Sequence, residues 1–161
     1  MNIVTLGNEV LRRKAEPVKN IGAGTVKLAA DMLETLLGAK GLGLAAPQVG
    51  VSDRLFVVHI TDDIPRVFIN PEILEISPDR TKYEEGCLSL PGIYADVTRP
   101  LALRVRGWNE KGKPFTIDAD GLLARVIQHE MDHLDGVMFI DHLSELKRKR
   151  ILKTWEEKFR A

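Results

Sequence analysis

The sequence predicts an α+β protein with a mostly antiparallel sheet. Three segments, at about 26–40, 121–135 and 144–159, have the periodicity of amphipathic helices, and the stretch between the first two contains short runs typical of strands. Helices that flank a group of consecutive strands, rather than alternating with them, indicate the α+β class. We therefore expect antiparallel sheets packed around the middle helix, with an N-terminal helix and a C-terminal helix on either side.

The first helix is predicted from apolar residues three and four positions apart, beginning at Val26 and including Leu37, and it should end near Lys40. Residues 41–50 follow, rich in glycine and too irregular for a helix or a strand. Strands are predicted at 55–60, at 67–70 with 73–76 as an extension, at 101–108 and at 114–118. The last two are joined by a predicted hairpin turn at 109–112.

The two later helices have recognisable ends. Asp118 or Asp120 can cap the start of the middle helix, and Gly136 can close it in a left-handed conformation. Ser144 is the expected N-cap of the C-terminal helix. The apolar positions of that helix are Leu146, Ile151, Leu152, Trp155 and Phe159.

Length and composition are those of one globular domain over residues 1–161, with a C-terminal helix from about 144 to 161. The chain has 161 residues, 44% of them hydrophobic, and its 23 basic residues balance 23 acidic ones. Zero net charge argues against general binding to DNA. No apolar run approaches the ~20 residues of a membrane span, and the start does not resemble a signal peptide. The single cysteine excludes an internal disulfide, so we expect a cytoplasmic protein without a membrane partner.

Two of the four histidines flank a glutamate in the segment His129-Glu130-Met131-Asp132-His133. Residues four apart lie on one face of a helix, so both imidazoles can reach a single metal ion. Glu130 then lies beside that ion, where it can take a proton from water. The alternative is a helix with two exposed histidines, but this spacing around a glutamate favours a metal site.

The third protein ligand stays open at this point. Catalytic sites of the zinc type use three protein ligands and leave one position for water. A third histidine six residues after His133 would complete one known pattern, but that position is Phe139. Glu156 or Glu157 would suit a thermolysin-like metallopeptidase, and Cys87 is the remaining candidate.

Three segments together resemble the motifs of the peptide deformylase family, in the same order and with similar spacing. They are Gly41-Leu-Gly-Leu-Ala-Ala-Pro-Gln48, Glu85-Gly-Cys-Leu-Ser89 and Gln128-His-Glu-Met-Asp-His133. The resemblance covers nearly the whole chain, and the sequence after Gly86 is similar to the bacterial type I form. The thermolysin-like alternative is disfavoured because it leaves Cys87 and Gln48 without a role.

The resemblance implies a metal-dependent hydrolase of protein biosynthesis. Such an enzyme removes the formyl group, as formate, from the N-formylmethionine of newly synthesised chains. It implies Cys87, His129 and His133 as ligands of Fe²⁺, for which zinc or nickel can substitute, and Glu130 as the general base. It also implies two donors for the oxyanion of the reaction, the side-chain amide of Gln48 and the backbone N–H of Leu88.

The resemblance further implies an apolar pocket for the methionine side chain. Its positions are Leu42, Gly43, Glu85, Leu122 and Val126. Two nearby residues depart from some relatives: Arg125 replaces an aliphatic residue and Tyr94 an arginine. We expect Arg99 to pair with Asp132. The basic run at 147–150 predicts a contact with the ribosome, because the C-terminal segment docks there in some family members.

Overall fold

The computed structural model describes residues 1–61 and 63–160, apart from the side chains of residues 159 and 160. Phe159, expected on the apolar stripe of the last helix, therefore has its side chain outside the described residues. The elements in chain order are the 3-10 turn η1 (Glu9–Arg12), α1 (Ala23–Ala39), β1 (Gly43–Ala45), the 3-10 turn η2 (Ala46–Val49), β2 (Leu55–Val58), β3 (Arg66–Ile76), β4 (Arg80–Cys87), β5 (Leu90–Pro100), β6 (Ala102–Trp108), β7 (Pro114–Asp120), α2 (Gly121–Leu134), the 3-10 turn η3 (Phe139–His142) and α3 (Glu145–Arg160).

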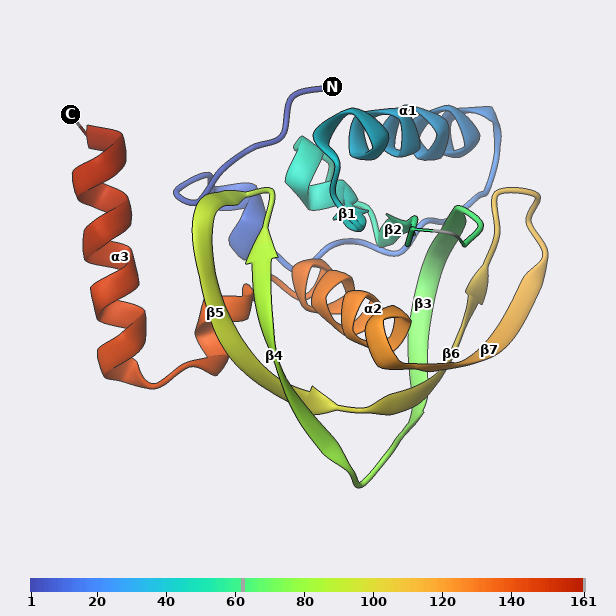
Figure 1. Ribbon diagram of the computed structural model, residues 1–161. Coiled ribbons are helices and arrows are strands. Elements are labelled where there is room, and N and C mark those ends of the chain that lie inside the picture. The colour runs from blue at the N-terminus through green and yellow to red at the C-terminus, as the bar shows by residue number, and fades with distance from the viewer. Residues whose placement is uncertain (62, 161) are drawn as a thin grey trace.

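The strands form two antiparallel sheets with α2 between them. One sheet has the order β1-β2-β3-β6-β7, and the other is the β4–β5 hairpin alone. Figure 1 shows α2 in the middle of the molecule, α1 over β1 and β2, and α3 beside β5. This arrangement confirms the α+β class with antiparallel sheets around the middle helix.

Strand β2 explains how two helices share one sheet. Side chains alternate between the faces of a strand, and all four residues of β2 are buried. Leu55 and Val57 belong to the apolar cluster under α1, which includes Met32 and Leu36. Their neighbours Phe56 and Val58 belong to the cluster under α2. The sheet is therefore covered by α1 on one face and by α2 on the other.

Two predictions about the strands were wrong. Residues 41–50 were expected to be irregular, but they contain the three-residue strand β1 and the turn η2. The β4–β5 hairpin was missed altogether, because β4 is largely exposed and has charged residues where apolar alternation would have marked a strand. Strands β2, β3, β6 and β7 lie close to their predicted positions, and Asn109 caps the predicted turn through hydrogen bonds from the N–H groups of Lys111 and Lys113.

The helices form as predicted, although their buried faces and caps differ in detail. Leu37, expected on the buried face of α1, is 70% exposed, because α1 packs mainly on the short strands β1 and β2 through a narrow stripe. Leu146 is likewise exposed on α3. Asp120 occupies the N-cap of α2 without a side-chain hydrogen bond, while Asp118 pairs with Arg104 instead. Within the described part of the chain, no helix has the length and apolarity required to cross a membrane.

Two predicted helix ends are confirmed. Gly136 follows α2 with a φ of 75°, the left-handed conformation expected of a closing glycine. A side chain there would also collide with the backbone of Arg12, since a Cβ would lie 2.6 Å from its carbonyl oxygen. Ser144 caps α3, because its hydroxyl accepts a hydrogen bond from the N–H of Lys147 at 3.3 Å.

Candidate active site

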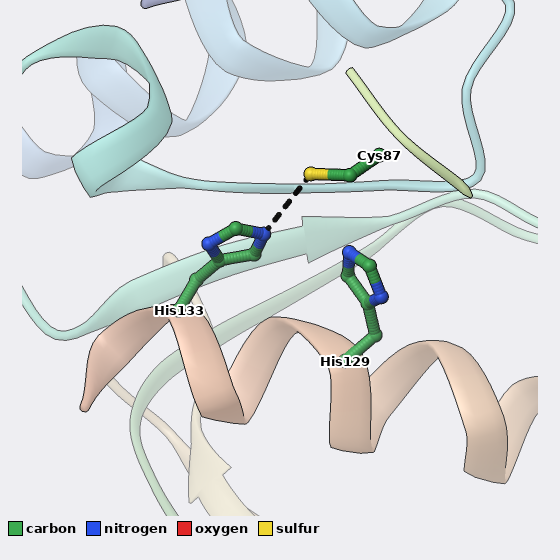
Figure 2. A group of neighbouring side chains, drawn as sticks. All are labelled: Cys87, His129 and His133. Atoms are coloured by element: carbon green, nitrogen blue, oxygen red, sulfur yellow. Dashed lines mark hydrogen bonds between the residues drawn. The ribbon is translucent and has the colours of Figure 1, made fainter. Parts of the chain in front are cut away.

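Three potential metal ligands converge where α2 meets the end of β4. His129 and His133 lie one turn apart on α2, and Cys87 is the last residue of β4. Their ligand atoms all lie within 4.8 Å of one another. Figure 2 shows both imidazoles rising from the helix toward the Cys87 sulfur, which lies 3.3 Å from Nε2 of His133.

The other candidates for the third ligand do not join this cluster. Among the described residues, Cys87, His129 and His133 form the one group of three whose ligand atoms could hold a metal ion. Glu156 and Glu157 are exposed on α3. The thermolysin-like arrangement therefore has no support in the structure.

Glu85 fixes the orientation of His129. The buried Glu85 carboxylate accepts a hydrogen bond from Nδ1 of His129 at 2.9 Å and two from Arg99, at 2.6 and 2.9 Å. An ionised carboxylate can only accept, so Nδ1 carries the hydrogen and Nε2 is the nitrogen left to bind a metal. The expected pair of Arg99 with Asp132 is confirmed at 2.9 Å, so Arg99 connects Glu85 to the outer side of the same helix.

Arg125 is a second buried cation on Glu85. Its guanidinium donates to Glu85 at 2.6 Å and to the carbonyl oxygens of Val97 and Thr81 at 2.9 and 2.7 Å. The group therefore ties α2 to both strands of the hairpin. Its Cζ also lies 5.6 Å from the centre of the Tyr83 ring. The charge of Arg125 is thus neutralised within the wall of the site.

These partners make Glu85 an acid-sensitive part of the fold. Burial by itself raises the pKa of Glu85, but hydrogen bonds from His129 and Arg99 outweigh it and lower the pKa to about 2. A carboxyl whose pKa is lower in the folded than in the unfolded state stabilises the fold above the unfolded value of about 4.3, and this stabilisation disappears as the pH falls toward the folded value.

We therefore predict that Glu85→Gln lowers the free energy of unfolding at pH 6, and that its difference from the wild type narrows between about pH 4.5 and pH 2. Denaturant unfolding of metal-free samples of both proteins over this range measures the difference. A difference that is constant with pH would contradict the ion-pair role of Glu85.

Glu130 lies buried beside the metal-ligand cluster. Burial raises its pKa to about 7, and its Oε1 atom is buried without a hydrogen-bond partner. Buried polar atoms without partners are rare and call for an explanation, such as a ligand or a water molecule at that point. A carboxylate with a pKa near the working pH is suited to accept and return a proton.

Gln48 and Leu88 approach the cluster from two other elements. The Gln48 side chain is buried on η2, where its oxygen accepts a hydrogen bond from the N–H of Ala45 at 2.9 Å. Its Nε2 donates to Ser89 Oγ at 3.1 Å and lies 3.5 Å from the Cys87 sulfur. Leu88 is in the turn between β4 and β5. Ser89, which anchors Gln48, was not predicted as a site residue, and only its place in the second motif could have indicated it.

The cluster opens into a cavity of about 360 Å³. Leu42, Leu122 and Val126 give it an apolar wall, while His129 and Glu130 lie among its lining residues. Glu85 also lines it, although its oxygens are occupied by the partners above. Tyr94 lies at the opening, 64% exposed, with its ring against Gly86, where a Cβ would come within 2.6 Å of the ring. The cavity thus offers an apolar recess next to the candidate metal centre.

The residues of the cluster fit a divalent metal ion. A thiolate with two neutral imidazoles is a donor set that several first-row metals accept. Nε2 of His133 faces the Cys87 sulfur, and the nearby Glu130 Oε1 is buried without a hydrogen-bond partner, as a site shaped for an additional ligand or water would leave it. Cys87, His129 and His133 could therefore hold one ion at the inner end of the cavity.

Comparison with known proteins agrees with this geometry. A family model described as polypeptide deformylase matches residues 1–149. Curated peptide deformylases from Agrobacterium fabrum and Neisseria meningitidis (serogroup C, strain FAM18) are 47% and 50% identical to this chain; the matches cover 99% and 94% of it, and 96% and 91% of those proteins. The crystal structure of a peptide deformylase from Ehrlichia chaffeensis in complex with actinonin is similar with a TM-score of 0.95 and 38% identity, over 100% of this chain and 98% of that one. A peptide deformylase from Legionella pneumophila matches with a TM-score of 0.93 and 42% identity, over 99% and 95% of the two chains.

Proposed function

This chain belongs to the polypeptide deformylase family, and on that premise we propose that it hydrolyses the formamide of N-formylmethionyl peptides, releasing formate and a free amino terminus. The observation that carries the proposal is the buried Glu130 carboxylate, unpartnered at Oε1, beside the Cys87–His129–His133 cluster. These groups line or adjoin one apolar cavity, which suits a substrate with an apolar side chain next to the bond that is cut.

Glu130 acts as the proton carrier. It takes a proton from the attacking water as the water oxygen bonds to the formyl carbon, and it then gives that proton to the leaving nitrogen as the C–N bond breaks. The raised pKa of Glu130 supports both directions of transfer. Gln48 Nε2 and the N–H of Leu88 donate hydrogen bonds to the developing oxyanion, and such a donor is typically worth about 2.7–4 kcal/mol.

Cys87, His129 and His133 hold one divalent ion, natively Fe²⁺, which zinc or nickel can replace. When bound, the ion polarises the formyl group and makes water more acidic. Glu85 keeps His129 in the tautomer that leaves Nε2 available. Leu42, Glu85, Leu122 and Val126 would surround the methionine side chain.

The direct test is formate release from a formyl-methionyl tripeptide by anaerobically purified protein of known metal content. We expect formate in amounts equal to the new amino termini. Loss of formate release on removal of the metal, and its return on adding Fe²⁺, would support the assignment. Metal-replete protein that releases no formate would contradict it.

The identity of the metal predicts a response to oxygen. The iron form should lose activity in air through oxidation of the ion or of the Cys87 sulfur, whereas zinc has no redox chemistry and its form should be stable. The half-lives of iron-loaded and zinc-loaded samples, in air and under nitrogen, measure this. Equal half-lives in all four conditions would exclude Fe²⁺ as an oxygen-sensitive native ion.

A contact with the ribosome, in the cytoplasm where formylated chains emerge, completes the proposal. Lys147, Arg148, Lys149 and Arg150 are all exposed on α3. Asp141 pairs with Arg148 and Glu145 with Lys149, but the four basic residues outnumber these two carboxylates, so this face would attract a phosphate-rich partner. We predict weak, salt-dependent binding to ribosomes. Reversing Lys147, Arg148 and Arg150 to glutamate should weaken co-sedimentation with ribosomes and leave hydrolysis of a short formyl peptide intact. Unchanged co-sedimentation at low salt would leave these residues as an ordinary solvated face.

A further inference from the structure

Two glycines line the cavity: Gly41, in the link between α1 and β1, and Gly43, the first residue of β1. Neither has a positive φ, so an alanine could adopt the same backbone conformation at either position. Glycine is therefore not required at these positions for its backbone freedom. What distinguishes them is the space that the missing side chain leaves.

At Gly43 that space is filled by Glu130. A Cβ on Gly43 would lie 2.6 Å from Oε2 and 2.9 Å from Cγ of Glu130, and 2.8 Å from Cγ1 of Val126. Val126 and Glu130 are one turn apart on α2, so both face the strand. Because Cγ is close to the helix backbone, Glu130 cannot avoid a Cβ by moving its tip alone, and its whole side chain would have to turn away.

At Gly41 the space is filled by Leu88. A Cβ on Gly41 would lie 2.8 Å from Cδ1 and 3.3 Å from Cγ of Leu88, with Leu36 Cδ1 at 3.1 Å on the other side. The next residue, Ser89, is fixed by Gln48 and by a hydrogen bond from the N–H of Leu6 to its carbonyl at 2.9 Å. The packing of the Leu88 side chain on Gly41 therefore helps to set where the N–H of Leu88 points.

We propose that Gly41 and Gly43 are positioning residues, each reserving the space for one group that acts on the formyl substrate. Gly43 places the Glu130 carboxylate and Gly41 places the Leu88 backbone. This assignment rests on the proposed function, because it takes the roles of Glu130 and Leu88 from it. It differs from a substrate-contact role for Gly43, in which the bare backbone would serve the peptide rather than Glu130.

The first experiment compares Gly41→Ala and Gly43→Ala with Gly38→Ala, a matched control on α1 where a Cβ meets nothing within 4 Å. Both test variants should keep stoichiometric metal and a KM within about twofold of the wild type, with kcat at least ~10-fold lower, since misplacing a catalytic group by about 1 Å can cost ~10²-fold. Gly38→Ala should be unchanged. Wild-type kcat in both test variants would overturn the proposal, as would a raised KM at constant kcat.

Second-site variants show which contact carries each effect. Leu88→Ala keeps the N–H but removes the two Leu88 atoms that crowd Gly41, leaving Leu36 Cδ1 at 3.1 Å. Gly41→Ala should therefore cost no further kcat in that background, and less thermal stability than it costs in the wild type. In the double variant Val126→Ala Glu130→Ala, where turnover is slow, calorimetry measures the affinity for a formyl-methionyl tripeptide. Adding Gly43→Ala should leave that affinity within about twofold, because the Val126 and Glu130 atoms that a Cβ would displace are gone.

The results separate this proposal from the proposed function. Wild-type protein that releases no formate would contradict the proposed function. The thermal stability of Gly41→Ala, compared with and without Leu88→Ala, would still test the steric contact between Gly41 and Leu88. Active wild type with additive stability losses for Gly41→Ala and Leu88→Ala would overturn the role of Gly41. A large loss of peptide affinity from Gly43→Ala in the Val126→Ala Glu130→Ala background would assign Gly43 to substrate contact instead.

Discussion

Cys87→Ala is expected to remove both the bound metal and the activity. The alanine leaves two imidazoles one helical turn apart, and a site with two protein ligands lacks the third that catalytic sites of this type use. The thiolate is also the one negatively charged ligand in the cluster, so its loss removes the main electrostatic attraction for a cation. Metal analysis after dialysis should find well under one equivalent, and formate release should fall to background.

Glu156→Ala and Glu157→Ala are the matched controls. Both residues are exposed on α3, away from the cluster, so each variant should keep full metal content and a wild-type rate. Cys87→Ser tests whether the metal is lost because the sulfur ligand is missing or because alanine leaves an empty space. Serine has a similar shape to cysteine, but its hydroxyl is a weaker metal ligand. One equivalent of tightly held metal in Cys87→Ala would show that Cys87 is not the third ligand.

Glu130→Ala should have the opposite pattern, with metal retained and turnover lost by at least ~10²-fold. The carboxylate does not belong to the ligand cluster, so its removal leaves Cys87, His129 and His133 unchanged. The remaining groups can still bind and polarise the substrate, but no side chain carries the proton from water to the leaving nitrogen. Steady-state kinetics with metal analysis on the same sample measures both quantities.

Glu130→Gln provides the control for shape. Its amide fills the same space against Gly43 but cannot act as a base, so it should be as inactive as alanine while preserving the packing of β1 on α2. A rate near that of the wild type in either variant would mean that another group transfers the proton. Together the two variants separate the loss of the proton-carrying carboxylate at position 130 from the loss of side-chain volume there.

The helix of the site could be predicted from the sequence because its signal is local. The spacing of His129 and His133 on an amphipathic segment determines that both imidazoles share a face, and the structure confirms that they converge. Cys87 could not be found in this way, since it lies 42 residues earlier and only the fold brings β4 beside α2. From the residues alone it was one candidate beside Glu156 and Glu157, and the resemblance of the motif around it decided the choice.

The β4–β5 hairpin was missed for a related physical reason. A two-stranded sheet with one open face needs few apolar residues, so it has little hydrophobic alternation to be recognised by. Its contact with α2 is largely polar, because Glu85 and Arg99 of the hairpin pair with Arg125, His129 and Asp132 of the helix. Such long-range ion pairs leave no periodic pattern in a sequence. Apart from the expected pair of Arg99 with Asp132, the network that orients His129 was therefore visible only in the structure.

That polar attachment has a consequence for how metal enters and leaves. A two-stranded ribbon is marginally stable alone, whereas His129 and His133 belong to a helix enclosed by the larger sheet. Local opening is easiest where few apolar contacts hold the chain. In the hairpin this is β4, which is mostly exposed, whereas β5 is packed into an apolar cluster through Leu90 and Val97. We therefore expect exchange of the ion to be limited by local opening of β4 around Cys87, while the two histidines stay on the enclosed helix. The lifetime of the bound ion is then governed by the buried Glu85 ion pairs as much as by the three ligands themselves.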